Sequence, residues 1–240
     1  MSFTKPIFPF YRYPRPLGAN SISPPTKELS VLSKRLMSLA EIPGFFGAVM
    51  CVTILDLKEL VLYSESIKDE ASSIDYDEQM DEYFSNEIQY VEYSLMSDRY
   101  TAGGEPKSDN TTEGCVRLAL LIFHNTVIWH FYPMLAGKLK KPLSTLLVAV
   151  ETTTAAGCYN LCKDLLIWIL FVGACACGAS LPLERDFFIS RLASVVQSQQ
   201  IHSWQELRAL LLEFFYVDRC YLVPLRTLWD ELRTVPVVVG

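Results

Sequence analysis

The sequence predicts an all-α fold: a single irregular domain of eight or nine helices packed around one very apolar helix at about 158–179. Half of the 240 residues are hydrophobic and 20% are charged, a balance that supports a large core and is unlike that of a disordered chain. Apolar residues recur mainly at the three- and four-residue spacing of helices. The alternating pattern of strands is rare, and its one late example, Val235–Val239, contains Pro236.

The first 25 residues predict an extended arm. Aromatic residues alternate with prolines there, and seven of the chain's 13 prolines lie in the first 43 residues. Proline favours polyproline geometry and does not continue a helix. We therefore expect an extended arm at 1–25 and an all-helical domain at 26–240.

The first half of that domain is expected to hold three helices. The third carries apolar residues at helical spacing, whereas the segment before it is polar and acidic. The expected segments are helices at about 26–40, 44–62 and 77–98, a turn at Pro43-Gly44, an acidic linker at about 64–78, and a loop at 99–110.

Capping residues, glycines and prolines mark the helices of the second half. Asn110 with Glu113, and Ser203 with Glu206, have the spacing of helix N-terminal caps. The expected helices are 111–132 (ended by Pro133 and Gly137), 141–154, 158–179 (ended by Gly178 and Pro182), 183–197, one that begins at Trp204, and a last one with Pro224 in its first turn.

The apolar run Leu165–Ala179 is too short to predict a membrane span. Its 15 uncharged residues would extend about 22 Å as a helix. A bilayer core is about 30 Å thick and needs about 20 residues. Lys163 and Asp164 close one end of the run, and Pro182 follows the other. A helix that is apolar on all sides is then expected to be buried in a protein core.

Acidity is concentrated in one segment. The net charge is −6, yet Glu65–Glu92 alone carries −9, so the rest of the chain carries +3. Such a balance disfavours duplex-DNA binding, which depends on Lys and Arg that neutralise phosphates. Two interpretations of the segment stay open: it docks on a partner through its aromatic residues, or it is a solvated linker followed by a packed amphipathic helix. The aromatic residues are Tyr76, Tyr83, Phe84, Tyr90 and Tyr93.

No catalytic, cofactor-binding or metal-ligating site is predicted. His124 and His130 are six residues apart on one expected helix, so their directions differ by about 120° and they do not form the four-residue pair of a zinc helix. Cys158 and Cys162 could share a helical face, but Cys175 lies more than three turns further on. We expect no cofactor and no enzymatic activity. The third histidine is His202.

The seven cysteines mostly lie in apolar runs, and prolines interrupt any apolar signal near the N-terminus. This arrangement is typical of reduced, buried thiols. We therefore expect the chain to reside in the nucleus or the cytoplasm.

Several strings in the second half, taken in order, resemble the C-terminal part of the fungal-specific transcription factor domain. That region accompanies the binuclear zinc-cluster DNA-binding module of fungal regulators. The resemblance covers about 110–233. It rests on Glu113–Ala119, Leu165–Ala179, Arg185-Asp186-Phe187-Phe188 with Leu192, Trp204 with Leu211, Phe214 and Phe215, and Leu228-Trp229-Asp230-Glu231.

The resemblance implies an all-helical, nuclear regulatory region that is often associated with dimers and that senses or transmits a signal. The zinc-cluster module has six cysteines in a short basic stretch, whereas the first two cysteines here are Cys51 and Cys115. We therefore expect no specific DNA binding by this chain alone. A fragment, a truncated product and a stand-alone relative all fit this departure.

The leading hypothesis is a transcription-regulator-like helical domain without its DNA-binding module. It would act through a protein partner, a homodimer or a small-molecule effector, and not at a membrane. The alternative is a small-molecule-binding or catalytic helical protein of a fungal metabolic pathway, whose tryptophans enclose an apolar ligand. Those tryptophans are Trp129, Trp168, Trp204 and Trp229.

Overall fold

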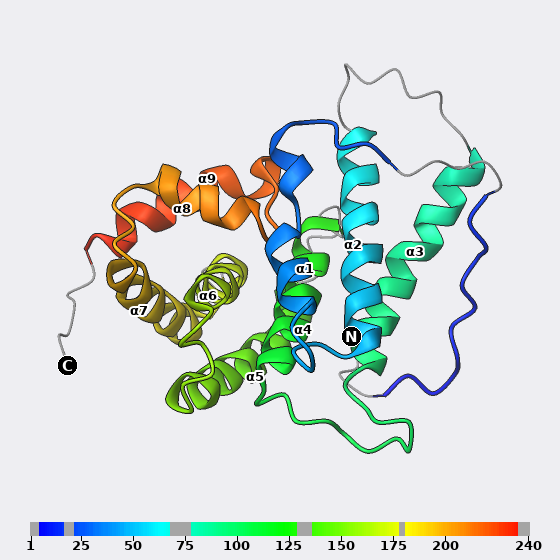
Figure 1. The fold of residues 1–240 in the computed structure, drawn as a ribbon, viewed down its shortest axis with the longest axis horizontal. Coiled ribbons are helices and arrows are strands. Elements are labelled where there is room, and N and C mark those ends of the chain that lie inside the picture. Colours follow the sequence, from blue (N-terminus) through cyan, green and yellow to red (C-terminus); the bar gives the residue numbers. More distant parts are fainter. Residues whose placement is uncertain (1–4, 17–21, 68–77, 129–135, 178–180, 235–240) are drawn as a thin grey trace. The chain divides into compact units, whose positions relative to one another are not determined.

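The structure is a computed structural model that describes residues 5–16, 22–67, 78–128, 136–177 and 181–234. Nine α-helices lie within these ranges, and the one β-contact in them is an isolated bridge between Tyr100 and Pro106 (Figure 1). The all-α prediction is confirmed. The chain divides into two compact units, 2–107 and 108–240. The single domain expected at 26–240 stays a prediction.

The N-terminal unit consists of one short 3-10 turn, three helices and the arm. The turn is Glu28–Val31, and the helices are α1 (Lys34–Ala40), α2 (Ala48–Ser66) and α3 (Glu78–Ser97). Helices α2 and α3 pack together, and the rings of Tyr63 and Phe84 stack between them with centroids 3.9 Å apart. Residues 5–16 of the arm are extended and run beside α3 (Figure 1).

Backbone geometry sets the ends of the first helices. The expected helix at 26–40 is interrupted at Ser33, which adopts a left-handed φ of 62°. Gly44, with φ 78°, confirms the expected turn. Helix α2 continues to Ser66, into the expected linker, and the Ser66 hydroxyl donates to the Leu62 carbonyl at 2.7 Å. Most of that linker, residues 68–77, lies outside the described residues.

The C-terminal unit places α6 among four other helices. Every residue from Leu165 to Ala174 is buried, and α6 contacts α4, α5, α7 and α9. No helix in the described residues is both long enough and apolar enough to cross a bilayer. The elements are α4 (Thr112–Phe123), a π-helical turn (His124–Ile128), α5 (Ala136–Ala155), α6 (Lys163–Cys177), α7 (Pro182–Ser198), α8 (Trp204–Leu212) and α9 (Asp218–Leu232).

The start of α4 and of α5 differs from the prediction. The cap of α4 is Thr111 and not Asn110, because the Thr111 hydroxyl accepts a hydrogen bond from the Gly114 N–H at 3.0 Å. Helix α5 begins at Ala136, so Gly137 and Pro142 lie inside it. Burial of Leu139, Leu143 and Leu146 along this helix outweighs the local preference of those two residues. The end of the expected helix 111–132 lies outside the described residues.

The start of α6 and of α9 also differs. Helix α6 begins at Lys163 and not near 158, because Gly157 adopts a φ of 73° after α5 and turns occupy 158–162. Helix α9 begins six residues before Pro224. Pro224 is exposed, so the hydrogen bond that proline cannot donate is missing on the solvent side of the helix.

Helices α6 and α7 approach closely at Gly173. A Cβ atom at this position would lie 2.6–2.8 Å from three ring carbons of Phe188, which is fully buried. Contacts this short do not occur between real side chains, so a residue without Cβ is required at this crossing. Elsewhere on α6, the Trp168 indole N–H donates to the Phe215 carbonyl at 3.0 Å, and its ring stacks on Phe214.

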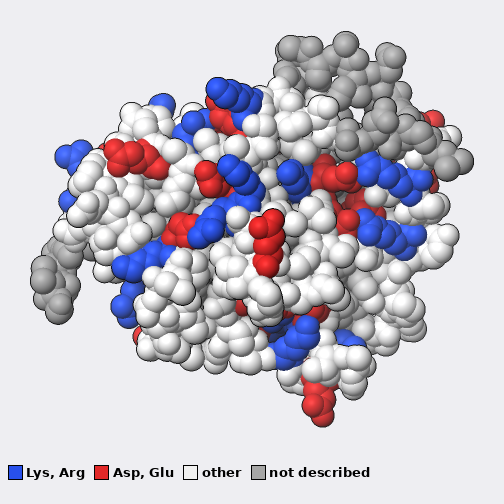
Figure 2. All heavy atoms as spheres, viewed as in Figure 1, with Lys and Arg blue, Asp and Glu red and all other residues white. Residues whose placement is uncertain are grey.

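Surface charge is mixed in sign. On the face shown in Figure 2, Lys and Arg side chains lie beside Asp and Glu side chains and do not form one extended patch of a single sign. Ion pairs within the C-terminal unit follow this pattern, including Arg185–Glu231 and Arg208–Asp218.

We predict that Gly173→Ala destabilises the chain by about 1–3 kcal/mol. Alanine gains up to about 1 kcal/mol of helix propensity over glycine, but its Cβ forces Phe188 out of its packed position. Urea unfolding followed by circular dichroism measures the difference.

The control is a double-mutant cycle with Phe188→Leu, in which the smaller side chain leaves room for the new Cβ. Gly173→Ala should cost less in the Phe188→Leu background. If Gly173→Ala costs no more in the wild-type background than in the Phe188→Leu background, the close approach of Gly173 and Phe188 is contradicted.

Candidate functional site

The two histidines in the described residues lie in different elements. His124 is buried in the π-helical turn, and His202 is exposed in the turn between α7 and α8. His130 lies outside the described residues. No group of three or more His, Cys, Asp or Glu side chains in the described part of the chain could hold a metal ion.

The seven cysteines differ in burial. None of them forms a disulfide. Cys158 and Cys162 occupy the turn before α6 and not one helical face; Cys158 is exposed and Cys162 is buried. Burial raises the pKa of Cys115, and it raises the pKa of Cys177 to about 12. A thiol with a raised pKa is protonated near neutral pH and is a weak nucleophile.

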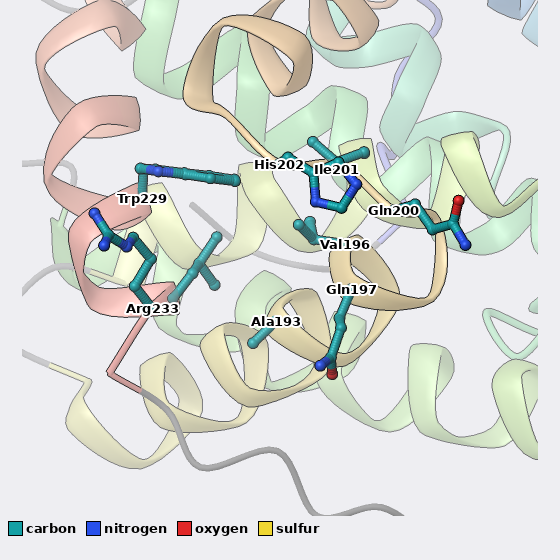
Figure 3. A pocket seen from close by; sticks show the side chains of 9 residues that line it. Ala193, Val196, Gln197, Gln200, Ile201, His202, Trp229 and Arg233 are labelled. Atoms are coloured by element: carbon teal, nitrogen blue, oxygen red, sulfur yellow. The ribbon is translucent and has the colours of Figure 1, made fainter.

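A hollow of about 320 Å³ lies where the end of α7, the following turn and α9 meet (Figure 3). Its floor is apolar and consists of the buried side chains of Ala193, Val196 and Leu232. Trp229, half-buried, forms one wall, and the exposed Arg233 follows the last residue of α9. The remaining lining residues, across the hollow from Trp229, are Gln197, Gln200, Ile201 and His202.

A tight turn after α7 carries three of the lining residues, Gln200, Ile201 and His202. The Ile201 N–H donates to the Val196 carbonyl at 3.2 Å, and Gln200 adopts a left-handed φ of 54°. This is the arrangement in which helices commonly end, and glycine usually occupies the left-handed position. Glutamine occupies that position here and is one of the residues that line the hollow, with its amide turned away from Trp229 (Figure 3).

The predicted capping box fixes the other end of the turn. The Glu206 N–H donates to the Ser203 hydroxyl at 3.2 Å, and the His202 N–H donates to a Glu206 carboxylate oxygen at 2.8 Å. The latter bond lowers the pKa of Glu206. The capping prediction is confirmed, and the box holds the His202 backbone at the edge of the hollow.

Two ion pairs fix α9, which carries the opposite wall. The Arg185 guanidinium donates to both carboxylate oxygens of Glu231, at 2.5 and 2.8 Å. Arg208 pairs in the same bidentate manner with Asp218 at the start of α9. Bidentate pairs restrict geometry more than a single contact does. Helix α9 is therefore tied to α7 and to α8.

The three tryptophans in the described residues lie in different surroundings. Trp168 is fully buried, while Trp204 and Trp229 are half-buried. The Arg226 guanidinium covers the Trp204 ring at 4.5 Å from its centroid. Trp129 lies outside the described residues. Of the three tryptophans that the structure describes, only Trp229 lines the hollow.

The chemistry of the hollow suits recognition of a flat apolar group that bears an acceptor or a negative charge. An indole face stacks on aromatic rings. A guanidinium pairs with a carboxylate, and the two glutamine amides both donate and accept. Among the described residues that line the hollow, none carries a carboxylate.

Comparison of the chain with family models, with curated protein sequences and with solved structures finds no match.

We predict that Gln200→Gly stabilises the chain by about 1 kcal/mol, because glycine adopts the left-handed conformation without the Cβ clash. Urea unfolding measures the change, with Gln200→Ala as the control that removes the side chain and keeps the Cβ. A loss of stability in Gln200→Gly would contradict the turn geometry.

We predict that the α9 ion pairs stabilise the fold above about pH 4.5 and lose this effect in acid. Hydrogen bonds from Arg208 and Arg185 lower the pKa values of Asp218 and Glu231 from 3.8 and 4.5. A lowered folded-state pKa gives stability that is present above the unfolded value and is lost as the pH falls through the folded value. Both pairs are partly exposed, so each contributes about 1 kcal/mol or less.

Thermal unfolding of the wild type and of Asp218→Asn/Glu231→Gln across pH 2.5 to 7 tests this. The difference in Tm should be largest near neutral pH and should shrink below about pH 4. A difference that stays constant with pH would contradict the assignment.

Proposed function

We propose that this chain is a transcription-regulator-like helical domain that lacks its own DNA-binding module and acts by binding other molecules. The sequence resemblance to the fungal-specific transcription factor domain supports the proposal. The resembling stretch, 110–233, coincides with the C-terminal unit, 108–240. The all-helical architecture agrees with that resemblance. Nuclear or cytoplasmic residence and a protein partner or homodimer belong to the same proposal.

The observation that carries the binding function is the hollow beside Trp229. It combines an apolar floor and an aromatic wall in a space of about 320 Å³, and the exposed Arg233 lies at its edge. Small-molecule pockets occupy about 300–1,000 Å³ and have mostly apolar walls with a few polar groups. The proposed effector is therefore a small planar molecule with an acidic group. Its aromatic part would lie on Trp229, and its acidic group would pair with Arg233.

The alternative function, a small-molecule-binding or catalytic protein of a fungal metabolic pathway, draws on the same hollow. If the protein only binds a metabolite, the residues proposed to hold the effector are sufficient. Its catalytic form needs a general acid or base beside the bound molecule, and among the lining residues that the structure describes His202 has that chemistry.

A reporter assay tests the regulatory role. The full chain is fused to a heterologous DNA-binding domain, and transcription from the matching promoter is compared with that given by the DNA-binding domain alone. The proposal expects altered output that responds to growth conditions. Unchanged output under every condition would count against it.

We predict that 2-naphthoate, a planar aromatic anion, binds the hollow. At about 0.3 kcal/mol per heavy atom this small probe gains about 4 kcal/mol, which corresponds to a Kd on the order of 1 mM. The indole N–H resonance of Trp229 should shift saturably in NMR titrations, with Trp229→Phe used to assign the signal.

Arg233→Gln should weaken this binding about tenfold, because it removes the cationic partner of the carboxylate. Arg191→Gln is the matched control, since Arg191 is exposed on α7 and does not line the hollow. Equal weakening by both variants, or a Trp229 signal that does not move, would exclude the proposed binding mode.

A further inference from the structure

The arm is held on helices α2 and α3 through two arginines. The Arg12 guanidinium donates to both carboxylate oxygens of Glu87, at 2.8 and 2.5 Å, and to Asp56 at 2.7 Å. It also lies over the ring of Tyr90, 4.2 Å from the centroid. Arg15 donates to both carboxylate oxygens of Glu59 at 3.0 and 2.8 Å. These contacts join residues 44 to 75 positions apart in the sequence.

The arginines of the arm and the acidic residues of α2 have the same spacing in the sequence. Arg12 and Arg15 are three residues apart in an extended, proline-containing segment, and polyproline geometry repeats every three residues. Their side chains therefore project to the same side. Asp56 and Glu59 are also three residues apart, on one face of α2. One arginine thus meets each acidic position of α2.

The surface also contacts the backbone of the arm. The Tyr13 N–H donates to the Asn86 side-chain oxygen at 2.9 Å, and the Asn86 amide donates to the Tyr11 carbonyl at 3.4 Å. Phe10 rests against Tyr90 and Tyr93, with ring centroids 5.8 and 5.5 Å away. A backbone clamp, an aromatic platform and acidic positions are the parts with which proteins hold extended peptides.

The arm lies on this surface as a ligand does and is not part of the core. Phe8 and Tyr11 are 80% and 75% exposed, and Phe10, Arg12 and Arg15 are only half-buried. By contrast, the Glu87 side chain beneath Arg12 is 4% exposed. Burial raises the pKa of Asp56, and the Arg12 guanidinium opposes that rise. Because a buried carboxylate without a cation is unfavourable, the surface requires a cationic occupant.

We propose that the face formed by Asp56, Glu59, Asn86, Glu87, Tyr90 and Tyr93, the α2–α3 acidic face, is a binding site for an extended peptide of a partner protein. The peptide carries two arginines three residues apart, with an aromatic residue two positions before the first. Residues 10–15 of the arm have this pattern and occupy the site within the same chain. A tethered occupant has an effective concentration in the millimolar range, so it competes with any partner peptide.

The test uses the full-length chain with Arg12→Ala/Arg15→Ala, which weakens the arm and leaves the acidic face intact. The probe is a fluorescein-labelled peptide of residues 5–16, and fluorescence anisotropy reports binding. The variant should bind the peptide saturably and at least tenfold more tightly than the wild type does. A peptide with both arginines replaced by alanine should not bind.

Two further variants separate specific recognition from general charge attraction. Lys140→Ala/Arg191→Ala removes two exposed positive charges elsewhere and should bind the peptide no better than the wild type. Adding Glu59→Gln/Glu87→Gln to the arm variant should abolish binding. The proposal would be overturned if the Lys140→Ala/Arg191→Ala control bound the peptide as tightly as the arm variant does. It would also be overturned if the arm variant still bound the peptide after Glu59 and Glu87 are neutralised.

A conservative variant guards against loss of folding in the alanine variant. Arg12→Lys/Arg15→Lys keeps both charges but loses the bidentate geometry, so its arm should compete less well than the wild-type arm. It should bind the peptide with an affinity between those of the wild type and the alanine variant. Failure of the peptide to bind either arm variant would overturn the proposal.

Discussion

Burial of α6 is the constraint on which the C-terminal unit depends. Ten consecutive residues of this helix, Leu165 to Ala174, are buried, so no face of it can be left to solvent. Helices α4, α5, α7 and α9 therefore contact it from different sides. Two local features make the packing specific: Gly173 admits the Phe188 ring, and Trp168 donates its indole hydrogen to the segment between α8 and α9.

The hollow follows from this arrangement. Helices α7 and α9 both pack on α6 and on each other, and the turn after α7 closes the space near their ends. The left-handed Gln200, the Ser203–Glu206 box and the α9 ion pairs hold the rim. The N-terminal unit uses a different principle. There, charge pairing and one asparagine clamp an extended segment on α2 and α3.

Features encoded locally could be predicted from the sequence, and features that need distant partners could not. The Ser203–Glu206 box, the Gly44 turn and α7 depend on residues within a few positions, and each lies where it was expected. The start of α9 was missed because packing overrides the signal of Pro224. No periodic pattern in the sequence shows that Trp229 lines the hollow. The same holds for the pairing of Arg12 with Glu87, which are 75 positions apart.

Native-state hydrogen exchange tests the central role of α6 most directly. If the C-terminal unit is organised around this helix, its amides can exchange only when the unit unfolds as a whole. The amides from Leu166 to Ala174 should then be the slowest to exchange, with an apparent free energy equal to that of global unfolding, while α8 should exchange faster. Exchange of the α6 amides as fast as those of α8 would contradict this account.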